Sequence, residues 1–331
     1  MKALLSNEPG GPETLRLEDI PTPQPGPGEL LVRVRACAIN FPDVLIIEDK
    51  YQLKPQRPFA PGGEIAGEVI GVGEDVSGWS SGDRLIAATG FGGLAEQVVI
   101  PVARAIPLPA ERSFEEGSAL LMTYATAIHA LVDRGRLQAG QTLLVLGAAG
   151  GVGIAAVEIG KALGARVIAA VSSEEKAEAA REAGADTAVV YPAGPFDKDG
   201  LKALSQLFKE AVGPGGADVI LDPVGGGYSE AALRSIGWEG RFLVVGFPAG
   251  IARLPLNLTL LKSCDVCGVF WGAFAARDPK ANAAHVDQLF RWWDEGKIAP
   301  KISATYPLER AGEAIAALRD RRAVGKLVVT L

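Results

Sequence analysis

Four glycines between residues 147 and 153 constrain the fold of this 331-residue chain more than any other feature. They follow a short apolar segment, residues 142–146, and precede an apolar segment with helical spacing, residues 154–163. A strand, a glycine turn and a helix in this order are typical of a dinucleotide-binding unit, because small residues let the backbone approach a pyrophosphate and the helix N-terminus attracts its charge. The alternative, a glycine turn that holds no ligand, is disfavoured by this strand and helix context.

Apolar strand-like segments and helical segments alternate from residue 113 onward. Residues 113–116 form a capping-box pattern, a Ser followed three positions later by a Glu, which predicts a helix start. Continuous apolar strands separated by helices predict a parallel sheet covered on both faces, and hence an α/β fold. The predicted strands are residues 142–146, 166–171, 187–190, 218–222, 241–245 and 265–270, and the helices between them are residues 154–163, 174–183, 201–212 and 230–236.

The first 110 residues differ in composition from the rest of the chain, because they hold thirteen of the 22 prolines. Proline interrupts helices, so long helices are not expected in this part. Residues 30–38 alternate apolar and polar side chains with a period of two, which predicts a half-buried strand. We therefore expect an irregular β domain ahead of the α/β part.

The composition excludes several classes of protein. With 33 basic against 39 acidic residues the net charge is −6, whereas binding of nucleic acid needs a basic surface. The longest uncharged stretch, residues 137–157, contains five glycines and does not resemble a membrane span. No signal-peptide pattern opens the chain, and three cysteines are too few for a disulfide framework. We expect a cytoplasmic protein with no nucleic-acid and no membrane partner.

The side chains after the predicted strand 166–171 indicate which nicotinamide cofactor is bound. NAD-binding proteins place an Asp or Glu there for the ribose 2′-hydroxyl, and this acid repels the 2′-phosphate of NADP. The chain instead has two hydroxyls and an ammonium at this point and a phenol after the next strand. These residues, which predict NADPH, are Ser172, Ser173, Lys176 and Tyr191.

Two alternatives remain for this position. Ser172 and Glu175 also match a capping box, which would explain both side chains without a cofactor. Glu174 and Glu175 lie close enough to the end of the predicted strand to keep NAD as the other candidate cofactor.

Short motifs spread over the whole chain carry a family resemblance. They are Asn40-Phe-Pro-Asp43, Tyr51, Pro61-Gly-Gly-Glu64-Ile-Ala-Gly67, Gly82-Asp-Arg84, the Gly147 to Gly153 loop, Asp222-Pro-Val-Gly-Gly226 and Gly325-Lys326. With these motifs the chain resembles the zinc-free branch of the medium-chain dehydrogenase/reductase superfamily, the NADPH:quinone oxidoreductases of zeta-crystallin type. The resemblance implies a GroES-like β domain, residues 1–121 with 271–331, and a Rossmann domain with a doubly wound parallel sheet, residues 122–270.

Zinc-binding members of the superfamily are similar to this chain at the same motifs, but they carry Cys and His ligands there. Asn40 stands at the position of the first Cys and Gly63 at that of the His, while Thr123 or a neighbour stands at that of the second Cys. A catalytic zinc normally needs three protein ligands that bind through N, S or O. The resemblance therefore implies that the protein binds no metal.

The resemblance also implies a set of site residues. Asn40 and Tyr51 are the candidate catalytic residues, with Tyr51 offering its hydroxyl to the substrate; local hydrogen bonding of Asn40 and Thr126 and simple packing of Tyr51 are the alternatives. The family often carries an Arg and a Gly ahead of this Tyr, but Ile47 and Asp49 stand here, so any substrate role of that Arg is lost. The implied cofactor-binding residues are Asn40, Thr126, Gly150, Gly151, Val152, Ser172, Ser173, Lys176, Tyr191, Asp222, Pro223, Val224, Gly246, Phe247, Phe270 and Trp271.

Without zinc the protein lacks the Lewis acid that alcohol oxidation uses, whereas a quinone accepts hydride with little more than correct positioning. We therefore predict NADPH-dependent, zinc-independent reduction of a quinone. One alternative is a reductase of enoyl thioesters, acrylyl thioesters or other α,β-unsaturated carbonyls, for which Lys54 and Arg57 hint at a site for CoA phosphates. The other is an NADPH-binding structural or regulatory protein. The apolar edge strand 265–270 further predicts a homodimer.

The remaining reactive side chains are predicted to be structural. Cys264 and Cys267 would lie about 10 Å apart on a strand, too far for a disulfide, so we expect apolar thiols. His129 and His285 lie on helical faces among apolar residues and have no triad partners in motif context.

Overall fold

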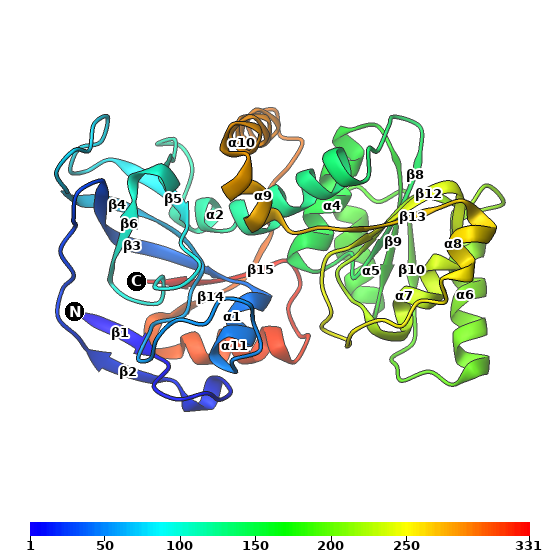
Figure 1. The fold of residues 1–331 in the computed structure, drawn as a ribbon, viewed down its shortest axis with the longest axis horizontal. Helices are drawn as coiled ribbons and strands as arrows, with labels where there is room; N and C mark the ends of the chain where they lie inside the picture. The colour runs from blue at the N-terminus through cyan, green and yellow to red at the C-terminus, as the bar shows by residue number, and fades with distance from the viewer. The chain divides into compact units, whose positions relative to one another are not determined.

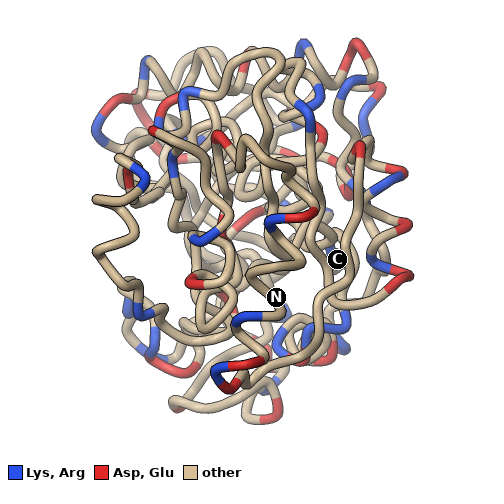
Figure 2. Tube along the Cα trace, turned by 90° about the vertical axis from the view of Figure 1, so that its right-hand side faces the viewer, with Lys and Arg blue, Asp and Glu red and all other residues tan.

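The computed structural model describes residues 1–331, which divide into two compact units (Figure 1). The first unit comprises residues 1–122 and 300–331, and the second comprises residues 123–299. None of the helices combines the length and the apolar character that crossing a membrane requires. Lys and Arg are interspersed with Asp and Glu along the trace in Figure 2, in keeping with the small net charge.

A seven-stranded sheet forms the first unit. Its strands run in the order β14-β15-β3-β4-β5-β7, and β6 also pairs with β3. Helices α1 (Phe41–Ile47), α2 (Phe114–Ser118) and α11 (Ala311–Arg319) accompany the sheet, and β1 (Lys2–Leu5) and β2 (Arg16–Asp19) form a separate hairpin. The sheet strands are β3 (Glu29–Ile39), β4 (Glu64–Val72), β5 (Arg84–Ala88), β6 (Gln97–Pro101), β7 (Ile106–Pro107), β14 (Ile302–Pro307) and β15 (Lys326–Thr330).

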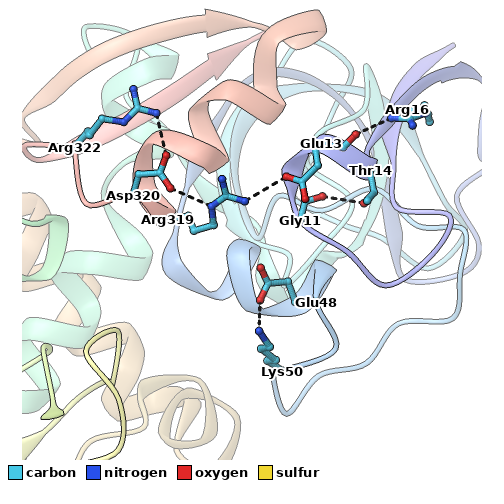
Figure 3. A network of polar contacts seen from close by, with 9 residues as sticks. All are labelled: Gly11, Glu13, Thr14, Arg16, Glu48, Lys50, Arg319, Asp320 and Arg322. Carbon is cyan, nitrogen blue, oxygen red and sulfur yellow. Dashed lines mark hydrogen bonds and ion pairs between the residues drawn. The ribbon is translucent and has the colours of Figure 1, made fainter.

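Strand β3 is the centre of the first unit and confirms the alternation expected for residues 30–38. Val32 and Val34 are fully buried, while Arg33 between them is exposed. At Gly67 in β4, an added Cβ would lie 2.2 Å from the Arg33 carbonyl oxygen, so only glycine lets the two strands approach this closely. At the surface, an exposed contact of 3.3 Å between Arg319 and Glu13 joins α11 to the N-terminal segment (Figure 3).

The second unit is a doubly wound parallel sheet with the strand order β10-β9-β8-β11-β12-β13. Every neighbouring pair is parallel, and the chain order reverses between β8 and β11, where such folds bind their ligands at the carboxyl ends of the strands. The strands are β8 (Thr142–Leu146), β9 (Arg166–Val171), β10 (Thr187–Val190), β11 (Ala217–Asp222), β12 (Ile236–Val244) and β13 (Asp265–Gly268). The helices are α3 (Thr126–Ile128), α4 (Gly151–Ala162), α5 (Glu174–Glu182), α6 (Lys198–Val212), α7 (Gly226–Leu233), α8 (Asn257–Lys262), α9 (Trp271–Arg277) and α10 (Pro279–Asp294).

The second unit extends further along the chain than predicted, to Ala299 rather than to residue 270. Its extra part, α9 and α10, is held by contacts within the unit. The Phe274 ring of α9 stacks on His129 at 4.1 Å, and the Asp133 carboxylate contacts both His129 Nδ1 at 2.6 Å and His285 Nε2 of α10 at 3.4 Å. The contacts of Phe274 with His129 and of His285 with Asp133 join residues more than 140 positions apart, so sequence periodicity could not assign the two helices to a unit.

Local sequence signals predicted one helix boundary correctly and another incorrectly. Ser113 caps α2 as expected, because its Oγ accepts the N–H of Glu116 and the Glu116 carboxylate accepts the N–H of Ser113. Helix α7, in contrast, ends at Leu233, and Ile236, predicted as helical, begins β12. The register of β12 against β11 shifts directly after Ile236, so the strand bulges where the apolar pattern suggested a helix end.

Candidate functional site

The glycine loop between β8 and α4 has the close backbone packing that a dinucleotide site requires. An added Cβ on Gly153 would lie 2.2 Å from the Gly147 carbonyl oxygen and 2.7 Å from Ala148 Cα, so no other residue fits there. Gly147 itself has a φ of +58°, in the left-handed region that glycine adopts without cost. The local signal in the sequence therefore corresponds to a genuine steric need.

The first turn of α4 offers free hydrogen-bond donors. Gly150 precedes the helix and donates its N–H to the Gly147 carbonyl at 2.9 Å. Gly151, Val152 and Gly153 form the first turn, whose N–H groups have no acceptor within the helix. No acidic side chain lies in this turn, so the positive end of the helix dipole is not neutralised. The residues present therefore fit a pyrophosphate.

At the carboxyl end of β9, two of the predicted side chains meet. The Lys176 ammonium donates a hydrogen bond to Ser172 Oγ at 3.2 Å. Ser173, rather than Ser172, caps α5, because its Oγ accepts the N–H of Lys176 at 3.3 Å. The predicted Ser172–Glu175 capping box is therefore wrong by one residue, since β9 ends at Val171 and Ser172 belongs to the turn. The shift leaves the Ser172 hydroxyl beside the ammonium.

The other side chains near this strand end are engaged elsewhere. Glu174 forms an exposed ion pair with Arg181 at 2.9 Å along the surface of α5. Tyr191 donates its backbone N–H to the Val171 carbonyl, and its ring packs in the core against Phe208 and Tyr228. The structure thus brings Ser172, Ser173 and Lys176 together and places the Tyr191 ring in the interior.

Asp222, at the end of β11, organises the turn that follows it. Its Oδ1 accepts the N–H groups of Val224 at 2.8 Å and Gly225 at 2.9 Å, and the Ser229 hydroxyl donates to Oδ2. Burial raises the pKa of this carboxyl group. Val224 in turn lies against the glycine loop, because a Cβ on Gly147 would meet Val224 Cγ2 at 2.9 Å. Asp222 therefore positions the Pro223–Val224 backbone, and only its Oδ2 keeps a lone pair for a further donor such as a cofactor hydroxyl.

The remaining predicted residues of the second unit flank the ends of β12 and β13. Gly246 and Phe247 follow β12, and about half of the Phe247 side chain is exposed. Phe270 follows β13 and is exposed, whereas Trp271 is buried and donates its indole N–H to Asn282 Oδ1 at 2.8 Å. Thr126 begins the short helix α3.

In the first unit, Asn40 belongs to a buried cluster of polar side chains with Glu64 and Lys326. The Lys326 ammonium donates to Asn40 Oδ1 at 2.5 Å and to Glu64 Oε2 at 3.2 Å. Asn40 Nδ2 donates to Glu64 Oε2 at 3.0 Å and to the Ala38 carbonyl at 3.2 Å. Both amide hydrogens of Asn40 are therefore used, and only one lone pair of its Oδ1 stays available. The sequence motifs contained Glu64 and Lys326, but nothing local indicated that they meet.

Asp43 lies in the first turn of α1, and Tyr51 follows the end of this helix. The Asp43 carboxylate accepts the backbone N–H of Asn40 at 2.8 Å and of Gly62 at 3.0 Å, and burial raises its pKa to about 6. Tyr51 is half-buried against the core, and its hydroxyl forms no hydrogen bond within the protein. Burial, and after it the charge of Asp43, raise the pKa of Tyr51. Its hydroxyl therefore stays protonated at neutral pH.

No group of three or more His, Cys, Asp or Glu side chains is arranged to hold a metal ion. At the family's zinc positions stand Asn40, whose amide is hydrogen-bonded as described, and Gly63, which has no side chain. The three cysteines are free thiols, of which Cys37 and Cys264 are buried and Cys267 is half-buried. Both histidines have structural contacts through Asp133, a shared partner that the sequence did not indicate.

Comparison with known proteins agrees with this architecture. The family model for the alcohol dehydrogenase GroES-like domain matches residues 26–110, and the model for zinc-binding dehydrogenases matches residues 151–287. Quinone oxidoreductase-like protein 2 of Bos taurus is 38% identical over 96% of this chain and 89% of its own length. The synaptic vesicle membrane protein VAT-1 homolog of Homo sapiens is 32% identical over 97% of this chain and 84% of its own length.

Solved structures extend the likeness to the whole fold. Mycobacterial Rv1454c complexed with NADPH has a TM-score of 0.92 and 30% identity, and the Escherichia coli quinone oxidoreductase complexed with NADPH has a TM-score of 0.90 and 28% identity. Both comparisons cover 100% of either chain. Fold and site together thus define an oxidoreductase with a GroES-like domain and a Rossmann domain. The chain belongs to the medium-chain dehydrogenase/reductase family, among its quinone oxidoreductase-like members.

Proposed function

We propose that the protein is an NADPH-dependent reductase that transfers hydride to a quinone. The observation that carries the proposal is the Ser172–Lys176 pair at the end of β9, at the position where an NAD-binding protein places an acid. The ion pair of Glu174 with Arg181 removes one of the two acids that could have favoured NAD. The NADPH complexes of two relatives with the same fold support the same cofactor.

Different residues of the second unit would bind different parts of the cofactor. Gly150, Gly151 and Val152 would hold the pyrophosphate through backbone N–H groups, and Ser172, Ser173 and Lys176 would hold the 2′-phosphate. The other proposed contacts are Asp222, Pro223, Val224, Gly246, Phe247, Phe270, Trp271 and Thr126, whereas the Tyr191 ring packs in the core and is no longer among them. When bound, NADPH supplies the hydride, and the protein positions it and excludes water.

In the first unit, Tyr51 is the proposed source of a proton or hydrogen bond for the substrate. Its hydroxyl has no partner within the protein, and its raised pKa keeps it protonated at neutral pH. Hydride addition to a quinone leaves a weakly basic phenolate oxygen, so one hydroxyl donor or water suffices. Asn40 is held rigidly by Glu64 and Lys326, so it would act only as an acceptor through Oδ1.

We further propose that the reaction needs no metal. The positions that hold zinc ligands in related enzymes carry an amide that is already hydrogen-bonded and a glycine, and neither is a zinc ligand of the usual kinds. Elemental analysis is expected to find no stoichiometric zinc, and a chelator should leave turnover unchanged. A zinc content near one per chain that disappears together with activity would contradict the proposal.

Turnover assays decide between the candidate activities. The purified protein is mixed with NADPH and 9,10-phenanthrenequinone, and in parallel with NADPH and an acrylyl thioester, while NADPH absorbance is followed; NADH replaces NADPH in control reactions. We expect faster oxidation of NADPH with the quinone. Of the two residues that hinted at a thioester, Arg57 is paired with Asp49, whereas Lys54 is exposed. Faster turnover of the thioester, or NADPH binding with no turnover at all, would refute the quinone proposal, and the latter would favour a regulatory role.

A further inference from the structure

The chain leaves helix α1 through a turn whose geometry usually requires glycine. The Lys50 N–H donates to the Leu45 carbonyl at 2.8 Å, and the Asp49 N–H donates to the Ile46 carbonyl at 3.3 Å. These two hydrogen bonds form a Schellman motif, in which the residue at the position of Asp49 adopts the left-handed conformation. Asp49 has a φ of +57°, a region that glycine adopts most readily and that other residues, Asp among the more tolerated of them, adopt at a cost.

The Arg57 guanidinium group contacts this turn, and the Gly10 N–H also donates to the Ile47 carbonyl there, at 3.0 Å. Arg57 Nη1 donates to Asp49 Oδ1 at 2.7 Å, and Arg57 Nη2 donates to the carbonyl of Ile47, the last residue of α1, at 2.9 Å. A cation at the carboxyl end of a helix also interacts favourably with the helix dipole. The Arg57 side chain is 15% exposed, so water competes with these contacts only weakly.

The guanidinium is itself fixed from the other side. Arg57 Nε donates to Ser6 Oγ at 3.3 Å, and the group lies 5.4 Å from the centre of the Phe59 ring. Ser6 and Phe59 are joined by backbone hydrogen bonds between their segments. Arg57 therefore connects the end of α1 to the segments of Ser6 and Phe59 through four different groups, a geometry that lysine with its single ammonium cannot reproduce.

We propose that Arg57 is a positioning residue for Tyr51, because it holds Asp49 in the left-handed conformation that sets the course of the chain two residues before the tyrosine. The inference rests on the proposed function, in which the Tyr51 hydroxyl serves the substrate. The related family often carries glycine at the position of Asp49, and glycine adopts the left-handed conformation without help. In this chain the contacts of Arg57 stabilise the same conformation of Asp49. Removal of the arginine should then matter only while Asp49 is present.

Four proteins test this dependence: the wild type, R57L, D49G and the double variant D49G/R57L. R57L keeps an aliphatic side chain over Phe59 but removes the donors, and D49G makes the left-handed turn favourable without them. K50A is the matched control, because it removes the exposed 2.7 Å ion pair of Lys50 with Glu48 in the same turn without touching Arg57 (Figure 3). Two readouts are taken: hydrogen exchange of the Lys50 amide, and kcat and KM with quinone and NADPH.

We expect R57L to exchange the Lys50 amide faster and to lose about tenfold in kcat with an unchanged KM for NADPH, since small displacements of a reacting group are costly. D49G and K50A should stay within about twofold of the wild type, and the double variant should recover most of the loss of R57L. Equal exchange in R57L and wild type would overturn the inference, as would a double variant as impaired as R57L, or faster exchange with unchanged kcat. If the wild type itself fails to reduce quinones, the proposed function fails, while the exchange rates still decide whether Arg57 holds the turn.

Discussion

Lys326 and Glu64 form an ion pair that is almost completely shielded from water, although 262 residues separate them in the chain. The lysine side chain is 4% exposed and the glutamate side chain is fully buried. Charges this deep persist only when they are paired and hydrogen-bonded, and here Asn40 and the Met122 N–H complete the set of partners. The pair joins the last strand of the first unit to β4.

Replacement of Lys326 by Met should strongly destabilise the first unit, because it leaves the Glu64 carboxylate buried without a cation. Loss of one partner of a buried pair costs about 3–5 kcal/mol. Urea unfolding of K326M measures this loss, and the double variant E64Q/K326M, which removes both charges, should recover part of it. A single variant as stable as the wild type would show that the pair contributes nothing.

Replacement of Lys176 by Ala should weaken binding of NADPH but not of NADH. A charge-assisted hydrogen bond to the 2′-phosphate contributes about 1.5–3 kcal/mol, and NADH has no phosphate at this position. Titration calorimetry with both cofactors measures the difference. K209A is the control, since it removes an equal charge from an exposed position in the last turn of α6, in the same unit. Equal losses for the two cofactors would contradict the assignment of the phosphate site.

Glu158 in α4 should make the stability of the protein depend on pH. Burial raises the pKa of Glu158 from 4.5 to about 7, although its carboxylate accepts hydrogen bonds from the Tyr124 hydroxyl and the Ala299 N–H. The folded state thus binds the proton more tightly than the unfolded chain does. This contribution to stability is present below pH 4.5 and is lost as the pH rises through about 7, with a magnitude on the order of 3 kcal/mol.

Unfolding by urea at pH 5 and pH 8 checks this dependence. The wild type should lose more stability between the two values than E158Q, whose amide has the same shape but does not titrate. Parallel pH profiles for the two proteins would mean that Glu158 does not titrate in this range.

We propose that the protein forms a homodimer through the edge of β13. Large apolar side chains are exposed on this strand and just before it, among them Val266 at 40% and Leu260 at 80%. An unpaired strand edge next to exposed apolar side chains is stabilised when a second copy covers it about a two-fold axis. Light scattering should give about twice the 34.4 kDa of one chain, and V266K should lower that mass while V266T should not. A wild-type mass of one chain at micromolar concentration would refute the dimer.

The parts of the structure that depend on neighbouring residues could be predicted from the sequence. The glycine loop and the alternation in β3 are examples, because the steric need at Gly153 and the burial of Val32 and Val34 leave marks within a few positions. The meeting of Ser172, Ser173 and Lys176 could be predicted for the same reason, since they lie within about one helical turn of each other, whereas the Tyr191 ring, expected beside them, packs in the core.

The predictions that were wrong concern contacts between distant residues or a position that is off by one residue. Helices α9 and α10 belong to the second unit because Phe274 and His285 meet His129 and Asp133, and no local pattern encodes such a meeting. The cap of α5 is Ser173 and not the predicted Ser172, because two adjacent serines can form the same hydrogen bond and only the end of β9 decides which of them does.

The second unit is inserted between the two halves of the first, and this dictates an order of events during synthesis. Residues 123–299 are synthesised after most of the first unit and before β15, which completes its sheet. Until β15 is synthesised, the edge of β3 that pairs with it has no partner strand, and Glu64 has no Lys326 to pair with. A first unit that folded before then would expose an uncovered strand edge, which favours association with other chains.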